Sequence, residues 1–292
     1  MTSEPFVRVV VCAALLATAA AGQEKLAFSA SDGQPLVGSY WKTKSTPIGG
    51  AVLVPMEGSN RYAYDALASR LTSAGVATLA LDPRGHGDAA KDREGRAIDV
   101  GPAAWKDASN PFRAMHLDAA AALKRLAEAA SLPEEKLALI GAGAGAAVAL
   151  DVAARSEHPH RPRALVLLSP ATEAAGLRLA DFAPGVKRPT LVFVGKDDDQ
   201  AAEGATLRAH PALAEADFRT LDCGPLRGTG AFGKVPGLEA SIATWTADVV
   251  LAPPPVEIGR GKLIVIDGAL APEEQAGATS VEIPFAPGGP SA

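Results

Sequence analysis

The stretch LALIGAGAGAAVAL, residues Leu137–Leu150, decides the fold. It begins with a short apolar run, Leu137–Ile140, which predicts a buried strand. The glycines of Gly141–Gly145 then predict a sharp turn, because glycine adopts backbone conformations that other residues avoid. The small residues of Ala146–Arg155 predict a helix. We therefore expect a strand, a tight turn and a helix in direct succession.

This arrangement has the shape of a nucleophile elbow, G-x-S-x-G, in which a serine projects from a strained turn. Gly143 stands at the serine position and has no side chain. The same residues also fit the dinucleotide-binding pattern G-x-G-x-x-[GA]. That pattern requires an acidic residue at the end of the next strand, where Ser169 and Pro170 stand. The elbow is therefore the favoured interpretation.

Strands and helices alternate on both sides of the elbow. Lys25–Ser29 and Gln34–Trp41, joined by a Ser-Asp-Gly turn, predict a hairpin. Further strands are expected at Ala51–Pro55, Ala77–Leu81, Ala164–Ser169, Thr190–Val194 and Asp217–Leu221. This order predicts an α/β fold with a mostly parallel central sheet, helices on both faces and an antiparallel N-terminal edge hairpin.

Three helices are predicted from apolar residues at helical spacing. The first has Tyr64, Leu67, Leu71 and Ala74 on one face. The second starts with Asn110 as its cap and Pro111 at its first position, and its apolar face is Phe112, Met115, Ala119, Leu123 and Leu126. The third, Gly237–Val250, has Ile242, Trp245 and Val249 on one face.

Residues 1–22 have the pattern of a secretory signal peptide, because the apolar run Val9–Ala21 follows Arg8 and is too short to span a bilayer. Cleavage is expected near Ala21–Gln23, which predicts a secreted or periplasmic protein with no stable membrane span. An uncleaved anchor is the alternative. After cleavage Cys223 is the remaining cysteine, so no intramolecular disulfide can form.

The domain is expected over residues 23–250, and a C-terminal extension over residues 251–292. Three prolines, Pro253–Pro255, interrupt the alternation. Lys262–Asp267 and Thr279–Pro284 could form a β-hairpin, and Ala286–Ala292 is expected to be a disordered end. The extension either drapes over the domain or forms a separate interaction module.

The composition is that of a soluble globular protein. Of the 292 residues, 48% are hydrophobic and 21% charged, which suffices for one large core. The formal net charge of -5 argues against a nucleic-acid partner.

Five motifs in order carry a family resemblance: Val52–Asn60, Ala80–Gly87, Leu139–Gly145, Leu191–Asp198 and Gly224–Phe232. Their sequences are VLVPMEGSN, ALDPRGHG, LIGAGAG, LVFVGKDD and GPLRGTGAF. This order resembles the α/β-hydrolase superfamily, near its dienelactone-hydrolase-like and small esterase branches. The resemblance covers about residues 25–250.

The resemblance implies a catalytic triad of which two members are replaced. The nucleophile position holds Gly143, the acid position Asp198 and the histidine position Arg227. Arginine cannot act as a general base, because it stays protonated. In the oxyanion loop Met56 follows a proline, and the backbone N–H of Ala144 is expected to remain as an oxyanion donor.

Arg227 has three open interpretations. It could form a salt bridge with Asp198 in place of a histidine–aspartate hydrogen bond. It could also form an anion pocket with the N-terminus of the helix that begins at Ala144. Otherwise it is a solvated loop residue.

Other polar residues have structural interpretations. Ser59 could be a displaced nucleophile, but a Gly-Ser-Asn turn is favoured. His86 is expected to serve loop architecture, and His116 to be structural. His158 and His160 could bind a metal, but no third ligand is evident, so a polar loop is favoured.

The sequence therefore predicts a secreted protein without catalytic activity, which binds a small-molecule ligand or a protein partner over a degenerate pocket. Met56, Ala144, Asp198 and Arg227 are the candidate binding residues. No cofactor and no metal are expected. One alternative is an active hydrolase of small esters or related acyl substrates, with an unidentified nucleophile. Another is a structural or envelope protein that acts through residues 251–292.

Overall fold

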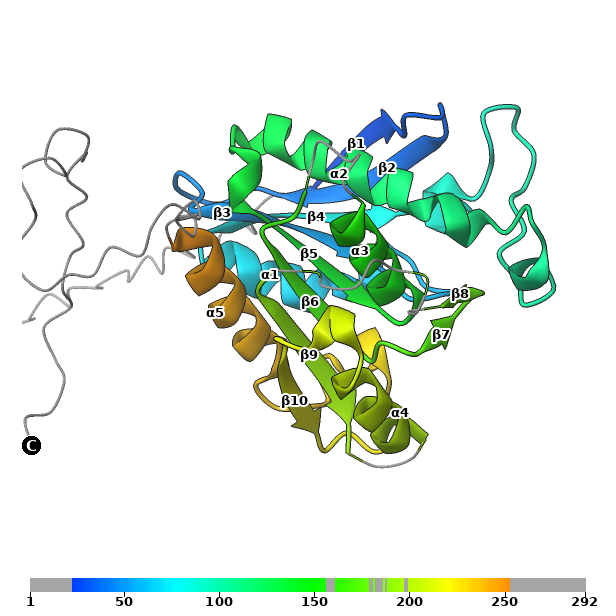
Figure 1. Ribbon diagram of the computed structural model, residues 1–292. Helices are drawn as coiled ribbons and strands as arrows, with labels where there is room; N and C mark the ends of the chain where they lie inside the picture. Colours follow the sequence, from blue (N-terminus) through cyan, green and yellow to red (C-terminus); the bar gives the residue numbers. More distant parts are fainter. Residues whose placement is uncertain are drawn as a thin grey trace, which may run out of the picture. The chain divides into compact units, whose positions relative to one another are not determined.

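An eight-stranded sheet forms the centre of the fold, in the order β1-β2-β4-β3-β5-β6-β9-β10 (Figure 1). The computed structural model describes residues 23–155, 161–178, 181, 186, 188–196 and 199–252. β1 pairs antiparallel with β2, and β2 with β4, whereas the remaining pairs are parallel. The strands are β1 (Gln23–Ser29), β2 (Pro35–Trp41), β3 (Gly49–Val54), β4 (Val76–Asp82), β5 (Leu137–Ala142), β6 (Ala164–Leu168), β9 (Thr190–Gly195) and β10 (Asp217–Leu221). The predicted mostly parallel sheet with an antiparallel edge is confirmed.

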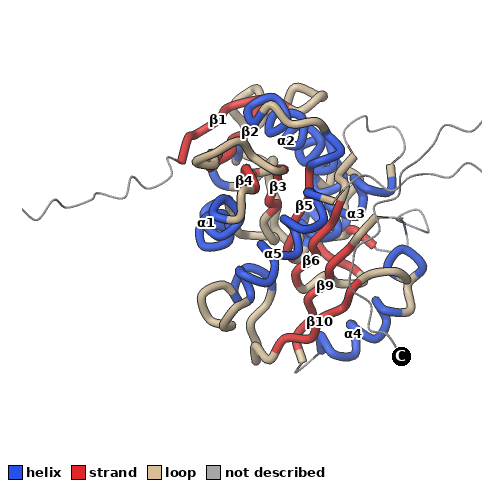
Figure 2. Tube along the Cα trace, turned by 90° about the vertical axis from the view of Figure 1, so that its left-hand side faces the viewer, coloured by secondary structure: helices blue, strands red, loops and turns tan. Residues whose placement is uncertain are grey.

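Helices cover both faces of this sheet (Figure 2). α1 (Asp65–Ser73) and α5 (Leu238–Leu251) pack on one face, and α2 (Met115–Ala130) and α3 (Ala144–Ala154) on the other. α4 (Asp199–Arg208) follows β9. Alternate side chains of β3 enter the two cores: Val52 packs with the α2–α3 core and Leu53 with the α1–α5 core. Both are fully buried, as a central parallel strand requires.

The N-terminal hairpin forms where the sequence predicts it. The Ala30 N–H donates to the Gln34 carbonyl at 2.9 Å, and Gly33 has a φ of 83° in the turn. A left-handed residue at this point is why glycine follows aspartate in the sequence. A second hairpin, β7 (Glu173–Ala174) with β8 (Leu177–Arg178), was not expected from the sequence.

Two helices differ from their predictions. The Asn110 side chain accepts a hydrogen bond from the Phe112 N–H at 3.0 Å, but it caps the 3₁₀ turn η4 (Pro111–Ala114), and α2 begins only at Met115. Short 3₁₀ turns are common at helix ends. In α5 the buried face is Ile242, Thr246 and Val250, at a spacing of four, whereas Trp245 and Val249 lie half-buried at its border.

The described residues belong to one unit, which extends to Pro253, and residues 254–292 form a second unit. The predicted signal peptide and C-terminal hairpin lie outside the described residues. None of the described helices combines the length and the apolar character that a membrane crossing requires.

Candidate functional site

The turn between β5 and α3 has the geometry of the predicted elbow. Gly143 caps α3 with φ 51° and ψ -120°, a conformation that side chains disfavour. Its N–H donates to the Leu168 carbonyl of β6 at 3.0 Å. A Cβ on Gly141 would clash with the Gly145 carbonyl, and one on Gly145 with the Val54 carbonyl. Glycine at these two positions therefore lets α3 lie directly against β5 and β3.

A carboxylate from the neighbouring loop enters this elbow. The Ala144 N–H, at the first turn of α3, donates to Oε2 of Glu57 at 2.9 Å. A Cβ placed on Gly143 would lie 2.8 Å from the same oxygen and 3.0 Å from Cβ of Met56. Glu57 thus fills the space that a side chain at position 143 would need. The N-terminus of α3 favours a negative charge at this point.

Glu57 is held there by a tight turn after β3. The Ser59 N–H donates to the Met56 carbonyl at 3.1 Å, and Gly58 has a φ of 71°. Ser59 therefore lies in the turn that the sequence favours.

The loop before α5 packs beside the elbow. Thr229 Oγ1 lies 3.6 Å from Sδ of Met56, and a Cβ on Gly228 would lie 3.1 Å from Cβ of Ala142. The Gly228 N–H donates to Oγ of Ser169 at 2.9 Å. Ser169 follows β6 with a φ of 46°, which is uncommon for a residue with a Cβ. The structure therefore gathers segments that follow β3, β5 and β6 with the loop at Gly228.

The comparisons agree with this geometry. Residues 51–187 match the model of the serine aminopeptidase family S33. The chain is similar to the structure of an esterase from Pyrococcus furiosus, at 15% identity and a TM-score of 0.60 over 78% of this chain and 93% of that one. It is also similar to an esterase domain of a Rhodothermus marinus protein, at 19% identity and a TM-score of 0.55 over 78% of this chain and 100% of that one. A third similar structure is a dienelactone hydrolase from Anabaena variabilis, at 22% identity and a TM-score of 0.54 over 78% of this chain and 96% of that one. No curated protein matches the sequence.

The chain has the α/β-hydrolase fold, and residues 51–187 match a family model of hydrolases. The sheet order and the elbow after β5 agree with this fold. At these identities the solved structures establish the fold, and the chemistry has to be argued from this chain's own residues.

Of the candidate site residues, the structure brings Gly143, Ala144 and Met56 together. Arg227 directly precedes Gly228 in the adjoining loop, and its side chain is exposed. Asp198 lies outside the described residues, so its pairing with Arg227 stays a prediction. Glu57 was missed by the sequence analysis, although it lies within the quoted oxyanion segment. No local signal in the sequence indicates its contact with Ala144, because 87 positions separate the two residues.

The loop after β4 is fixed by two buried ion pairs. Asp82 pairs with Arg61, and Oδ1 of Asp118 accepts from Nη2 of Arg84 at 2.6 Å. Gly87 has a φ of 49° and approaches Asp82 so closely that a Cβ would clash with its carboxylate. These contacts hold the Asp-Pro-Arg-Gly-His-Gly segment in one conformation.

His86 is buried within that loop. Its Nδ1 lies 3.1 Å from the Arg84 carbonyl, and its ring packs edge-on against Phe112 with centroids 5.6 Å apart. Burial lowers the pKa of His86, although the nearby carboxylates of Asp82 and Glu57 oppose that shift. These contacts are those of a residue that supports the loop.

The remaining candidates lie away from the elbow or outside the described residues. Nδ1 of His116 lies 2.9 Å from the Arg113 carbonyl and 3.5 Å from Oδ2 of Asp151. His158 and His160 lie outside the described residues. Within the described residues, no group of three or more histidine, cysteine or acidic side chains could hold a metal ion.

Proposed function

We propose that this chain is an exported, catalytically silent member of the α/β-hydrolase superfamily, which binds a small-molecule ligand or a protein partner over its degenerate pocket. One observation carries the proposal: the Glu57 carboxylate accepts the Ala144 N–H and occupies the space beside Gly143. The two features together leave neither a nucleophile nor an open oxyanion site at the elbow.

Acyl transfer on this fold uses a nucleophile, a general base and N–H donors for the developing oxyanion. Gly143 supplies no nucleophile. Arg227, in the position implied for the histidine, remains protonated and cannot accept the proton of a serine. These two replacements support a protein that retains the scaffold without the chemistry.

Glu57 adds a third obstacle that is independent of the other two. An oxyanion donor contributes to catalysis when it faces the oxygen on which charge develops. The Ala144 N–H is already bound to a carboxylate at 2.9 Å. A substrate carbonyl oxygen placed there would meet a negative charge instead of a donor.

The test is hydrolysis of p-nitrophenyl acetate and butyrate by the purified protein, together with two variants. Gly143→Ser/Arg227→His restores two triad positions, and Gly143→Ser/Arg227→His/Glu57→Ala also opens the elbow. We expect the wild type to match the buffer blank, and the triple variant to exceed the double variant. Adding Asp198→Ala to the triple variant should remove the gain. Turnover by the wild type well above the blank would refute the proposal.

An active hydrolase is the second candidate, and the backbone of Ser169 is the observation that favours it. A left-handed conformation at a residue with a Cβ stores strain, and such strain clusters at functional sites. However, its hydroxyl accepts the Gly228 N–H, and no described histidine is hydrogen-bonded to it. If the wild type hydrolyses the esters, Ser169→Ala distinguishes the cases, because loss of the rate would identify this serine as the nucleophile.

Export is tested separately. N-terminal sequencing of the mature protein should find its first residue near Ala21–Gln23. A mature protein that begins at Met1 would remove signal cleavage from the proposal and leave the argument about the elbow unchanged.

A further inference from the structure

A pocket separate from the elbow lies where three segments meet. It has a volume of about 380 Å³, and its wall comes from the β1–β2 hairpin, the loop after β4 and the segment that leads into α2. Gln34, Arg84 and Pro111 represent these three segments, and His116 lines the pocket from the first turn of α2. Gly143, Ala144 and Glu57 are not among its lining residues. Its volume is at the small end of the range for ligand pockets, about 300–1,000 Å³.

Two arginines, Arg84 and Arg113, are among the lining residues of the pocket. The Arg84 side chain is 10% exposed, and its guanidinium is fixed by Asp118 and by Asp32, whose Oδ2 lies 2.8 Å from Nη1. These two carboxylates more than offset the single charge of Arg84. Arg113, in contrast, is exposed and forms no ion pair with the described residues. None of the described lining residues is acidic. Arg113 is therefore the cation of the lining that can pair with an anionic ligand.

The pocket also has apolar lining residues. They are Ile98, Ala108, Pro111 and Ala114. Pro111 and Ala114 belong to the turn whose cap, Asn110, donates through Nδ2 to the carbonyls of Trp105 and Ala175 at 2.9 and 2.8 Å. Because these hydrogen bonds tie the turn to two other segments, the wall is preformed, as most small-molecule sites are.

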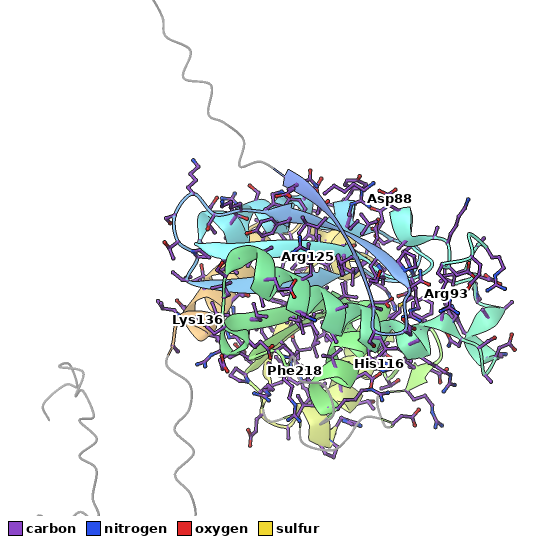
Figure 3. All side chains as sticks on the ribbon, turned by 90° about the horizontal axis from the view of Figure 1, so that it is seen from above. Asp88, Arg93, His116, Arg125, Lys136 and Phe218 are labelled. Carbon is purple, nitrogen blue, oxygen red and sulfur yellow. The ribbon has the colours of Figure 1, made fainter. Side chains whose placement is uncertain are left out.

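We propose that this pocket binds a small organic carboxylate, whose anionic group pairs with Arg113 and whose apolar body packs against Ile98 and Pro111. An arginine presents a planar fork of donors that matches a carboxylate. The apolar wall favours an organic acid over a bare inorganic anion, which could use only the charge. His116, labelled in Figure 3, is one of the lining residues, so its ring should report on the occupant.

The experiment uses isothermal titration of the full-length protein with benzoate, benzamide and inorganic phosphate. Benzamide has nearly the same shape as benzoate but no charge. We expect benzoate to bind at least about tenfold more tightly than benzamide, the difference expected from one charge-assisted hydrogen bond. Phosphate should bind more weakly than benzoate, since it cannot contact the apolar wall.

Arg113→Ala should weaken benzoate by about the same tenfold factor. Arg125→Ala is the matched control: Figure 3 shows Arg125 farther along α2 than His116, and it is not a lining residue. Circular dichroism should find both variants folded, because neither side chain is buried. In NMR spectra benzoate should shift the ring signals of His116.

Three results would overturn the proposal. The first is no benzoate binding in the millimolar range. The second is equal binding of benzoate and benzamide, or equal losses in Arg113→Ala and Arg125→Ala. The third is phosphate binding as tightly as benzoate, which would indicate a charged surface without an apolar site. None of these results depends on whether the elbow is catalytic.

Discussion

Placing a side chain on Gly143 tests whether Glu57 occupies the elbow. Gly143→Ala forces a Cβ into a conformation with φ 51°, which costs about 1–3 kcal/mol, less about 0.4–1 kcal/mol because alanine restricts the unfolded chain. The Cβ would also lie 2.8 Å from Oε2 of Glu57, so the carboxylate has to leave. Its hydrogen bond to the Ala144 N–H is charge-assisted and contributes about 1.5–3 kcal/mol.

We therefore expect Gly143→Ala to lower the free energy of unfolding by about 1.5–5.5 kcal/mol in the wild type. In a Glu57→Ala background the same change should cost about 0–2.5 kcal/mol, because the hydrogen bond of the carboxylate is already absent. The difference between the two backgrounds is the coupling between the residues. Urea unfolding, followed by far-UV circular dichroism, measures the free energy of unfolding of the wild type, the two single variants and the double variant.

The control is Gly224→Ala. Gly224 also has a positive φ, 53°, but a Cβ there would contact nothing within 4 Å. It should cost the same in both backgrounds. If Gly143→Ala also costs the same in both, Glu57 does not occupy the elbow. If Gly143→Ala stabilises the protein, the strain argument is wrong.

Three further predictions concern the scaffold around the site. Asp118→Asn leaves the buried guanidinium of Arg84 without its main carboxylate and should lower the free energy of unfolding by about 3–5 kcal/mol, measured in urea. Gly145→Ala should lower the melting temperature more than Gly224→Ala does, since its Cβ would meet backbone carbonyl oxygens that cannot move aside. Because burial lowers the pKa of His86, the unfolded chain takes up a proton below about pH 6.5 that the folded protein resists. The free energy of unfolding should therefore decrease as the pH falls below that value toward the folded pKa. Urea unfolding at pH 7 and at pH 5 measures this decrease, which should be smaller in His86→Gln than in the wild type.

The elements with local signals could be predicted from the sequence. The turn at Gly143 is determined by residues adjacent in the chain, and so is the hairpin at Gly33. The continuous apolar run around Val52 identified a strand buried on both faces. The buried face of α5 differs from the predicted one. Ile242, Thr246 and Val250 share the buried side of the helix, and the large Trp245 ring is half-buried at its border.

The contacts within the site were harder to predict than the strands and turns that form it. Glu57 meets Ala144 across 87 positions of sequence, and nothing local to either residue indicates the contact. It arises because β3 and β5 are neighbours in the sheet, so the segments that follow them meet at one edge. The left-handed backbone of Ser169 depends in the same way on tertiary contacts, through the Gly228 N–H.

If the chain is catalytically silent, as proposed, the carboxylate beside Gly143 also limits how hydrolase activity could arise again in evolution. A serine regained at position 143 would meet Glu57 at once and would still lack a proton acceptor at position 227. A histidine regained at 227 would have no hydroxyl to activate, and removing Glu57 alone would only empty the elbow. Each single step back thus brings no catalytic benefit for selection to retain, and the first step also destabilises the fold.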